Sequence, residues 1–163
     1  PGYSVADNYI SDLGVGPSAL VFNSSVFMLG VLIVCGACLI QRSFHSRLFV
    51  VLLILAGVGT MGVGLFSENF GIIHTIASSV VFLFGGFAAI ASFKLQKPPL
   101  SYLAVLLGIV ALVALALFAS KIYLGLGKGG MERMIAYPVL LWGVGFSGYL
   151  IAVSEHKTTS AEK

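Results

Sequence analysis

Five stretches without a single Lys, Arg, Asp or Glu divide this chain and constrain its fold more than any other feature. They lie near residues 19–40, 48–66, 72–93, 101–119 and 134–153. A helix needs roughly 20 apolar residues to cross the hydrocarbon core of a bilayer, where only helices and closed barrels satisfy the backbone. The sequence therefore predicts an all-α fold: a polytopic transmembrane helical bundle with five spans in this chain.

The charge content excludes a soluble globular domain. Only 9% of the 163 residues are charged and 58% are hydrophobic, whereas roughly a quarter of the residues of a soluble domain are charged. The net charge of +3 comes from cations that flank the spans, where they contact lipid phosphates. We expect membrane lipids and other membrane subunits as partners, and no nucleic acid, because no basic run is interleaved with aromatic residues.

The distribution of cations predicts the orientation in the cell membrane. One side of the predicted bundle carries six cations, at positions 42, 47, 94, 97, 157 and 163, and the other carries three, at positions 121, 128 and 133. Cytoplasmic loops carry the excess of Lys and Arg. A multi-pass arrangement follows in which the N-terminal segment lies outside and the tail, residues 154–163, lies in the cytoplasm.

The first 18 residues differ from the spans. Val5, Tyr9 and Leu13 share one helical face, and polar residues fall away from it. This pattern predicts a short amphipathic helix at the outer interface. Gly14, Gly16 and Pro17 would then turn the chain into the membrane.

Polar residues predicted for the outer surface are the candidate site. If the protein is an enzyme, the acid–base candidates are Asp7, Asp12, Glu68, His74 and Glu132, since carboxylates beside a histidine can transfer protons. The candidates for holding a lipid headgroup are Asn8, Ser11, Arg133 and Tyr137. The alternative is that the same residues wet the outer surface and cap helix ends.

Two further motifs do not predict chemistry. Cys35 and Cys38 form a C-x-x-C inside a span, where nothing stabilises thiolates, so they are expected to be small buried hydrophobic residues. No metal site and no cofactor is expected. Gly145-Phe146-Ser147-Gly148 matches the serine motif of rhomboid-type intramembrane proteases, but Ser147 lies about 20 Å along its helix from the outer end, too far from His74 to be activated.

Several short motifs resemble those of a prokaryotic multi-pass membrane family catalogued as domain of unknown function 998. They are Pro1-Gly2-Tyr3-Ser4, Tyr9-Ile10-Ser11-Asp12-Leu13-Gly14, Gly71 with His74, and Glu132-Arg133 followed by Tyr137-Pro138 and Trp142. That family has six spans, so the resemblance implies a further helix before Pro1. The family is distantly similar to the Frag/Dram/Sfk six-helix membrane group, a likeness of fold that implies no reaction.

Two functions are consistent with these observations. The first is an integral membrane protein without catalysis, acting as a structural or accessory component of a membrane complex. The alternative is a lipid-headgroup-binding or lipid-modifying enzyme with its site at the outer surface. The second reading requires the candidate residues to converge on a common cavity.

Overall fold

A computed structural model describes residues 2–161, with side chains to residue 154, and the part it describes is helical without strands. The five long helices are α1 (Ala19–Phe44), α2 (Arg47–Leu65), α3 (Ile72–Ala91), α4 (Leu100–Ala119) and α5 (Gly127–Ala161). Three short 3-10 helices join them: η1 (Ser11–Gly14), η2 (Glu68–Phe70) and η3 (Ser92–Leu95). All five long helices are long and apolar enough to cross a membrane, which confirms the predicted polytopic bundle.

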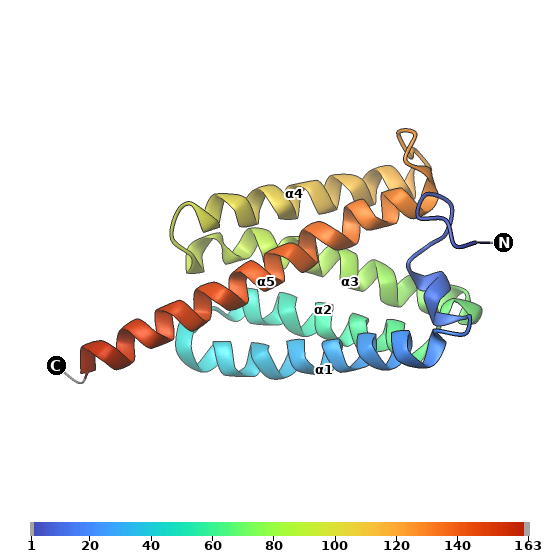
Figure 1. The fold of residues 1–163 in the computed structure, drawn as a ribbon. Helices are drawn as coiled ribbons and strands as arrows, with labels where there is room; N and C mark the ends of the chain where they lie inside the picture. Colours follow the sequence, from blue (N-terminus) through green and yellow to red (C-terminus); the bar gives the residue numbers. More distant parts are fainter. Residues whose placement is uncertain (1, 162–163) are drawn as a thin grey trace.

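Each long helix packs against the next along the chain, and α5 also packs on α3. Figure 1 shows α5 crossing the other helices obliquely, with the N-terminal segment at one end of the bundle and the C-terminus at the other. We call these the strap end and the tail end. Short connections between successive helices make antiparallel neighbours the expected arrangement.

The last helix differs most from its predicted bounds. The glycine-rich stretch before residue 131, which lies outside the predicted span of residues 134–153, forms the first turn of α5, which begins at Gly127. At the other end, α5 continues through Ala161, so the predicted tail from residue 154 is largely a continuation of the helix. No proline or glycine follows Gly148 to end it. The side chains of Glu155 and Lys157, assigned to the cytoplasmic tail from sequence, lie outside the described part, as do residues 162 and 163.

Small residues set the contacts between neighbouring helices. A Cβ on Gly64 would meet the backbone of Phe27, so α1 and α2 approach closely there. Gly86 and Gly108 do the same for α3 and α4. Small residues on α2, α3 and α4 thus seat neighbouring helices. Gly143 on α5 does not, because a Cβ there would meet no atom within 4 Å.

An aromatic cluster closes the bundle toward the tail end. The rings of Phe49, Trp142 and Phe146 lie 5.3–6.3 Å apart, centroid to centroid. Ser92 is fully buried beside them and accepts hydrogen bonds from Trp142 Nε1 at 2.9 Å and Gln96 Nε2 at 3.1 Å. The buried indole N–H and the Gln96 amide therefore both have an acceptor where η3 meets α5.

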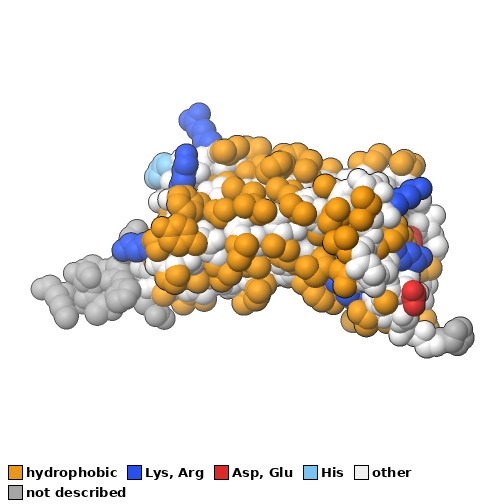
Figure 2. Space-filling model, turned by 90° about the horizontal axis from the view of Figure 1, so that it is seen from above, with side chains coloured by type: hydrophobic (Ala, Val, Ile, Leu, Met, Phe, Trp, Pro, Cys, Tyr) orange, Lys and Arg blue, Asp and Glu red, His pale blue; other side chains and the backbone are white. Residues whose placement is uncertain are grey.

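The outer surface is a band of apolar side chains between two charged ends. Figure 2 shows hydrophobic side chains along the length of the molecule, Lys and Arg at both ends, and Asp and Glu gathered at the strap end. Helix α1 is the least covered of the five long helices, and its buried residues are Gly30 and Ala37. Lipid tails can cover such a band, as expected for a bundle that spans a membrane.

The segment before α1 is helical only in part. The expected amphipathic helix of residues 1–18 is confined to the short 3-10 helix η1, and turns occupy residues 5–7. Side chains compete for the backbone here, since Asn8 Oδ1 accepts the Ser4 amide at 3.0 Å and Asp12 Oδ2 accepts the Tyr9 amide at 2.9 Å. We call residues 3–14 the strap.

Candidate functional site

The strap lies against the first turn of α5. The Gly129 amide donates to the Ala6 carbonyl at 2.8 Å, and the Gly130 amide to the same oxygen at 3.4 Å. A Cβ on Gly127 would collide with Ala6, and one on Gly129 with the Asn8 carbonyl. Glycine is therefore required where these two backbones touch, and the free amides of the helix N-terminus gain partners.

Arg133 holds the strap in place. Its Nη1 donates to the carbonyls of Val5 and Asn8, each at 2.9 Å, and to the Gly129 carbonyl at 2.8 Å. Its Nη2 donates to the Tyr3 hydroxyl. The side chain is only 7% exposed. Nη1 and one donor of Nη2 are thus used within the protein itself, so most of the planar fork that could hold a phosphate is already engaged.

Glu132 is bound in the same way. One carboxylate oxygen accepts the Ile10 amide of the strap, and the side chain is 8% exposed. Glu132 also lies within electrostatic range of Arg133, Glu68 and Asp12. Glu132 and Arg133, adjacent on α5, therefore both hold the strap. Glu132 accepts a hydrogen bond from it, and Arg133 donates hydrogen bonds to it.

Asp12 organises the strap internally. It accepts the Tyr9 amide and the Asn8 Nδ2, both at 2.9 Å. Burial of the Asp12 carboxylate would raise its pKa, but the hydrogen bonds from Asn8 and Tyr9, together with the nearby Glu68 and Lys128, hold that pKa below its ordinary value. Asp12 is therefore ionised at neutral pH and acts as an acceptor.

Glu68 on η2 is the partner of Asp12. Ser11 Oγ donates to Glu68 Oε2 at 3.3 Å, and η1 and η2 are in contact here. Burial raises the pKa of the Glu68 carboxyl above its ordinary value, and the neighbouring Asp12 raises it further. Of these two carboxyl groups, Glu68 therefore holds a proton more tightly than Asp12 does.

His74 joins the ends of two helices. It is 8% exposed, and its Nδ1 lies 2.7 Å from the Phe66 carbonyl, which can only accept. Its Nε2 lies 3.3 Å from the Ser78 hydroxyl. His74 interacts electrostatically with Glu68, but both ring nitrogens already have partners within the bundle, as a structural histidine does.

The remaining candidates do not join this cluster. Asp7 is exposed and its carboxylate accepts from Ser4 Oγ at 2.8 Å. Tyr137 is 56% exposed on the outer side of α5. The structure thus brings together Asn8, Ser11, Asp12, Glu68, Glu132 and Arg133, leaves Asp7 and Tyr137 outside, and gives His74 to the α2–α3 junction.

Sequence reasoning missed the aromatic part of the strap contact. Lys128 Nζ lies 4.4 Å from the centre of the Tyr9 ring, which in turn packs edge-on against Phe118 at 6.1 Å. Tyr3 was likewise not singled out, although its hydroxyl binds Arg133. Glycines spaced at 127 and 129, just before Glu132-Arg133, were the signal of a close backbone approach.

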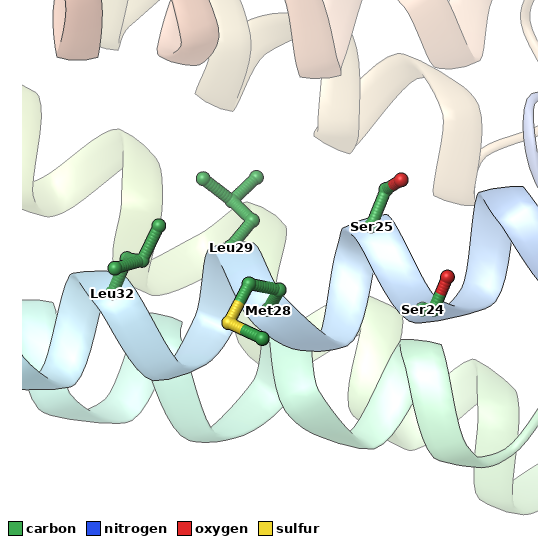
Figure 3. Close-up of a pocket in the computed structure, with 5 residues that line it drawn as sticks. All are labelled: Ser24, Ser25, Met28, Leu29 and Leu32. Carbon is green, nitrogen blue, oxygen red and sulfur yellow. The ribbon is translucent and has the colours of Figure 1, made fainter.

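Two hollows on the surface of the bundle both lie away from the strap. The first, of about 420 Å³, is lined by Ser24, Ser25, Met28, Leu29 and Leu32. All five come from α1, along which Figure 3 shows their side chains. The Ser24 hydroxyl donates to the Leu20 carbonyl at 2.6 Å, within its own helix. This hollow is an open, lipid-facing groove.

The second hollow, of about 500 Å³, lies between the strap-end halves of α1 and α2 and includes Asn23, Phe27 and Gly64. Across the described side chains, no group of three or more His, Cys, Asp or Glu could hold a metal ion. Cys35 and Cys38 are exposed on α1, not buried as expected, because that helix has only one neighbour along most of its length.

Comparison with known proteins agrees with the architecture. No curated protein and no solved structure matches this chain. A family model described as "Protein of unknown function (DUF998)" matches residues 1–148, which includes the strap, η2 and the first two-thirds of α5. The chain therefore belongs to this family, in agreement with the resemblance of its short motifs.

Proposed function

We propose that this integral membrane protein is a structural or accessory component of a membrane complex and performs no chemistry of its own. The observation that carries the proposal is the use of its best candidate residues. Arg133, Glu132 and His74 all bind other groups of the same chain. A headgroup site would leave such groups free to meet a ligand.

The orientation that we propose places the strap end outside and the tail end in the cytoplasm of a cell membrane. Within the described side chains, four cations lie at the tail end, at positions 42, 47, 94 and 97, and three at the strap end, at positions 121, 128 and 133. Four of the six acidic residues of the chain belong to the strap end, and the other two are at positions 155 and 162. The excess of cations at the tail end supports this assignment.

The surface of α5 supports contact with another membrane helix. A Cβ on Gly143, Gly145 or Gly148 would meet no atom within 4 Å, so the bundle itself gives no reason for glycine there. Glycine lowers helix propensity, and small residues on a membrane helix let a second helix approach closely. Ser147, one turn from Gly143, is also exposed. We place a partner subunit on the face that Gly143 and Ser147 share.

Purification from native membranes tests the proposal. The wild-type protein is expected to copurify with one or more membrane subunits in constant stoichiometry, measured by quantitative mass spectrometry after gentle solubilisation. Gly143→Leu should reduce the recovered partner severalfold, because the new side chain keeps a second helix away. Val113→Leu, at a 53% exposed position of α4, is the matched control and should recover the partner in full.

A different outcome would contradict the accessory role. If the protein elutes as a discrete monomer that retains one phospholipid, and Arg133→Lys removes that lipid, the strap end binds headgroups after all. Equal recovery of the partner with Gly143→Leu and Val113→Leu would reject the α5 face as the contact.

A further inference from the structure

The connection between α4 and α5 presents apolar side chains to its surroundings. Residues 120–126 join the two helices, and Ile122, Leu124 and Leu126 are 43–69% exposed. Tyr123 lies among them but is half-buried and packs against Phe118, with the ring centroids 6.0 Å apart. Single exposed apolar residues are ordinary, whereas a group of them marks a surface that another molecule covers. The loop therefore attaches to the bundle by one side chain and presents three.

The backbone of this loop is held in a conformation that favours glycine. Lys121 and Leu124 have φ angles of 58° and 49°, in the left-handed region that residues with a side chain enter only at a cost in free energy. The Ile122 amide nevertheless donates to the Leu117 carbonyl at 2.9 Å, so the turn is a defined one. Glycine at position 124 would avoid the cost. The packing of the bundle thus gives no reason for an exposed leucine there.

The length of α4 places the loop at the depth of the lipid headgroups. The helix has 20 residues, which corresponds to a length of about 30 Å, the thickness of the hydrocarbon core. Lys97 precedes the helix and Lys121 follows it, so a cation stands at each boundary, where lipid phosphates lie. The loop therefore begins where the hydrocarbon core ends, in the leaflet at the strap end.

The direction of the loop carries it over the lipid beside the bundle. Figure 1 shows this orange connection at the upper right, turning away from the bundle and across the direction of the helix axes. A loop that continued along the axes would extend into water. Figure 2 shows hydrophobic side chains reaching the strap end beside Lys and Arg. The exposed side chains of the loop thus continue the apolar band of the bundle outward, at headgroup depth.

We propose that residues 120–126 are an interfacial anchor, in which Ile122, Leu124 and Leu126 insert between the phospholipids around the strap end and Lys121 binds their phosphates. Within the described residues, no group forms a hydrogen bond, ion pair or ring contact with the Lys121 side chain, which is exposed. The apolar residues and the cation are the combination that binds the boundary between headgroups and acyl chains. A protein partner would have to lie over lipid at this depth to reach the same side chains.

The anchor is continuous with the part of α5 that holds the strap. Residue 126 is followed directly by Gly127, and the Gly129 amide donates to the Ala6 carbonyl of the strap. Interfacial side chains fix the depth and tilt of the helices to which they belong. The loop therefore sets the level at which α5 presents the strap above the membrane.

Spin labelling measures the depth of the loop in liposomes of phosphatidylethanolamine and phosphatidylglycerol. In a background with Cys35→Ser and Cys38→Ser, Leu124→Cys carries a nitroxide, whose exposure to oxygen, which concentrates in lipid, is compared with its exposure to a water-soluble nickel chelate. The oxygen-to-nickel ratio should be at least about threefold that of a label on Asp7→Cys, an exposed position of the strap. A label on Val113→Cys, at an exposed position in α4, should give a higher ratio still, because it faces the acyl chains.

Variants of the neighbouring side chains test which groups place the loop. Ile122→Asn together with Leu126→Asn should move the label at position 124 into water and lower its oxygen-to-nickel ratio about threefold. Lys121→Gln should lower the ratio less, because the apolar side chains stay. Val15→Asn is the matched control, since it makes the same kind of change at an exposed position of the strap end outside the loop. It should leave the ratio unchanged.

Two results would overturn the proposal. A ratio at position 124 equal to that at position 7 would place the loop in water. Low exposure of the label to both oxygen and the nickel chelate would mean that protein, such as a second copy of this chain, covers the loop in place of lipid.

Discussion

Single residues at the strap end show how one set of groups can serve either recognition or architecture. A guanidinium is suited to phosphate because its donors form a planar fork. In Arg133 that fork is directed at the carbonyls of Val5, Asn8 and Gly129. The guanidinium on which the predicted headgroup site depended therefore holds together two parts of the chain that are distant in sequence.

Replacing Arg133 tests this role directly. Arg133→Met should lower the free energy of unfolding by about 2–3 kcal/mol, because a buried charged donor to several oxygens is lost. The amides of residues 6–10 should exchange faster while those in the middle of α2 do not change. Thermal unfolding in detergent and hydrogen exchange measure the two effects. A variant as stable and as protected as wild type would show that these bonds contribute nothing.

Asp12 gives a prediction in the acidic range. Burial opposes its ionisation, but the hydrogen bonds that it receives hold the pKa of the Asp12 carboxyl below its ordinary value. Its contribution to stability is thus present at neutral pH and lost as the pH falls through that lower value. Asp12→Asn should be less stable than wild type near pH 7 and equal to it in strong acid, as judged by thermal midpoints.

At the scale of elements, the first turn of α5 depends on close backbone approach. Gly129→Ala places a Cβ against the Asn8 carbonyl and should destabilise the protein by about 2 kcal/mol through overpacking. Gly148→Ala is the matched control in the same helix, because a Cβ there meets no atom within 4 Å. It should leave the thermal midpoint unchanged or raise it. The contact is unimportant if both variants behave alike.

The junction of η3 with α5 rests on one hydroxyl. Ser92→Ala removes the acceptor for Trp142 Nε1 and Gln96 Nε2 and should cost about 2 kcal/mol, since buried donors lose their partner. Ser147→Ala, whose hydroxyl binds only the Gly143 carbonyl of its own helix, should be nearly neutral. Trp fluorescence should shift in Ser92→Ala alone as the indole environment changes.

The elements that could be predicted from the sequence are the membrane spans, because the surrounding lipid excludes charged residues from them. Uncharged runs identified all five spans, because lipid admits no unsatisfied backbone. The ends of the helices are harder to predict. Gly127, Gly129 and Gly130 indicate a loop unless the strap is known to pack on them. Ile10 and Glu132 are 122 positions apart in sequence. No local pattern reveals that such a pair shares a hydrogen bond.

At the scale of the whole molecule, polar side chains serve the two ends and apolar ones the middle. On the face drawn in Figure 2, hydrophobic side chains predominate between two ends that carry the charged ones. At the strap end, the charged side chains also form hydrogen bonds within the chain. Helices α1 and α5 leave apolar or glycine-lined faces uncovered. An accessory subunit needs this combination of a fixed bundle and free helix faces.

Cysteine labelling tests the five crossings, on which the whole account depends. In a background with Cys35→Ser and Cys38→Ser, single cysteines replace Asp7 and Lys121 at the strap end, and Ser43 and Lys97 at the tail end; all four positions are exposed. A membrane-impermeant maleimide should label the strap-end pair in intact cells and the tail-end pair only after permeabilisation. Labelling of both ends in intact cells would contradict the crossings, and labelling of the tail end alone would contradict the orientation.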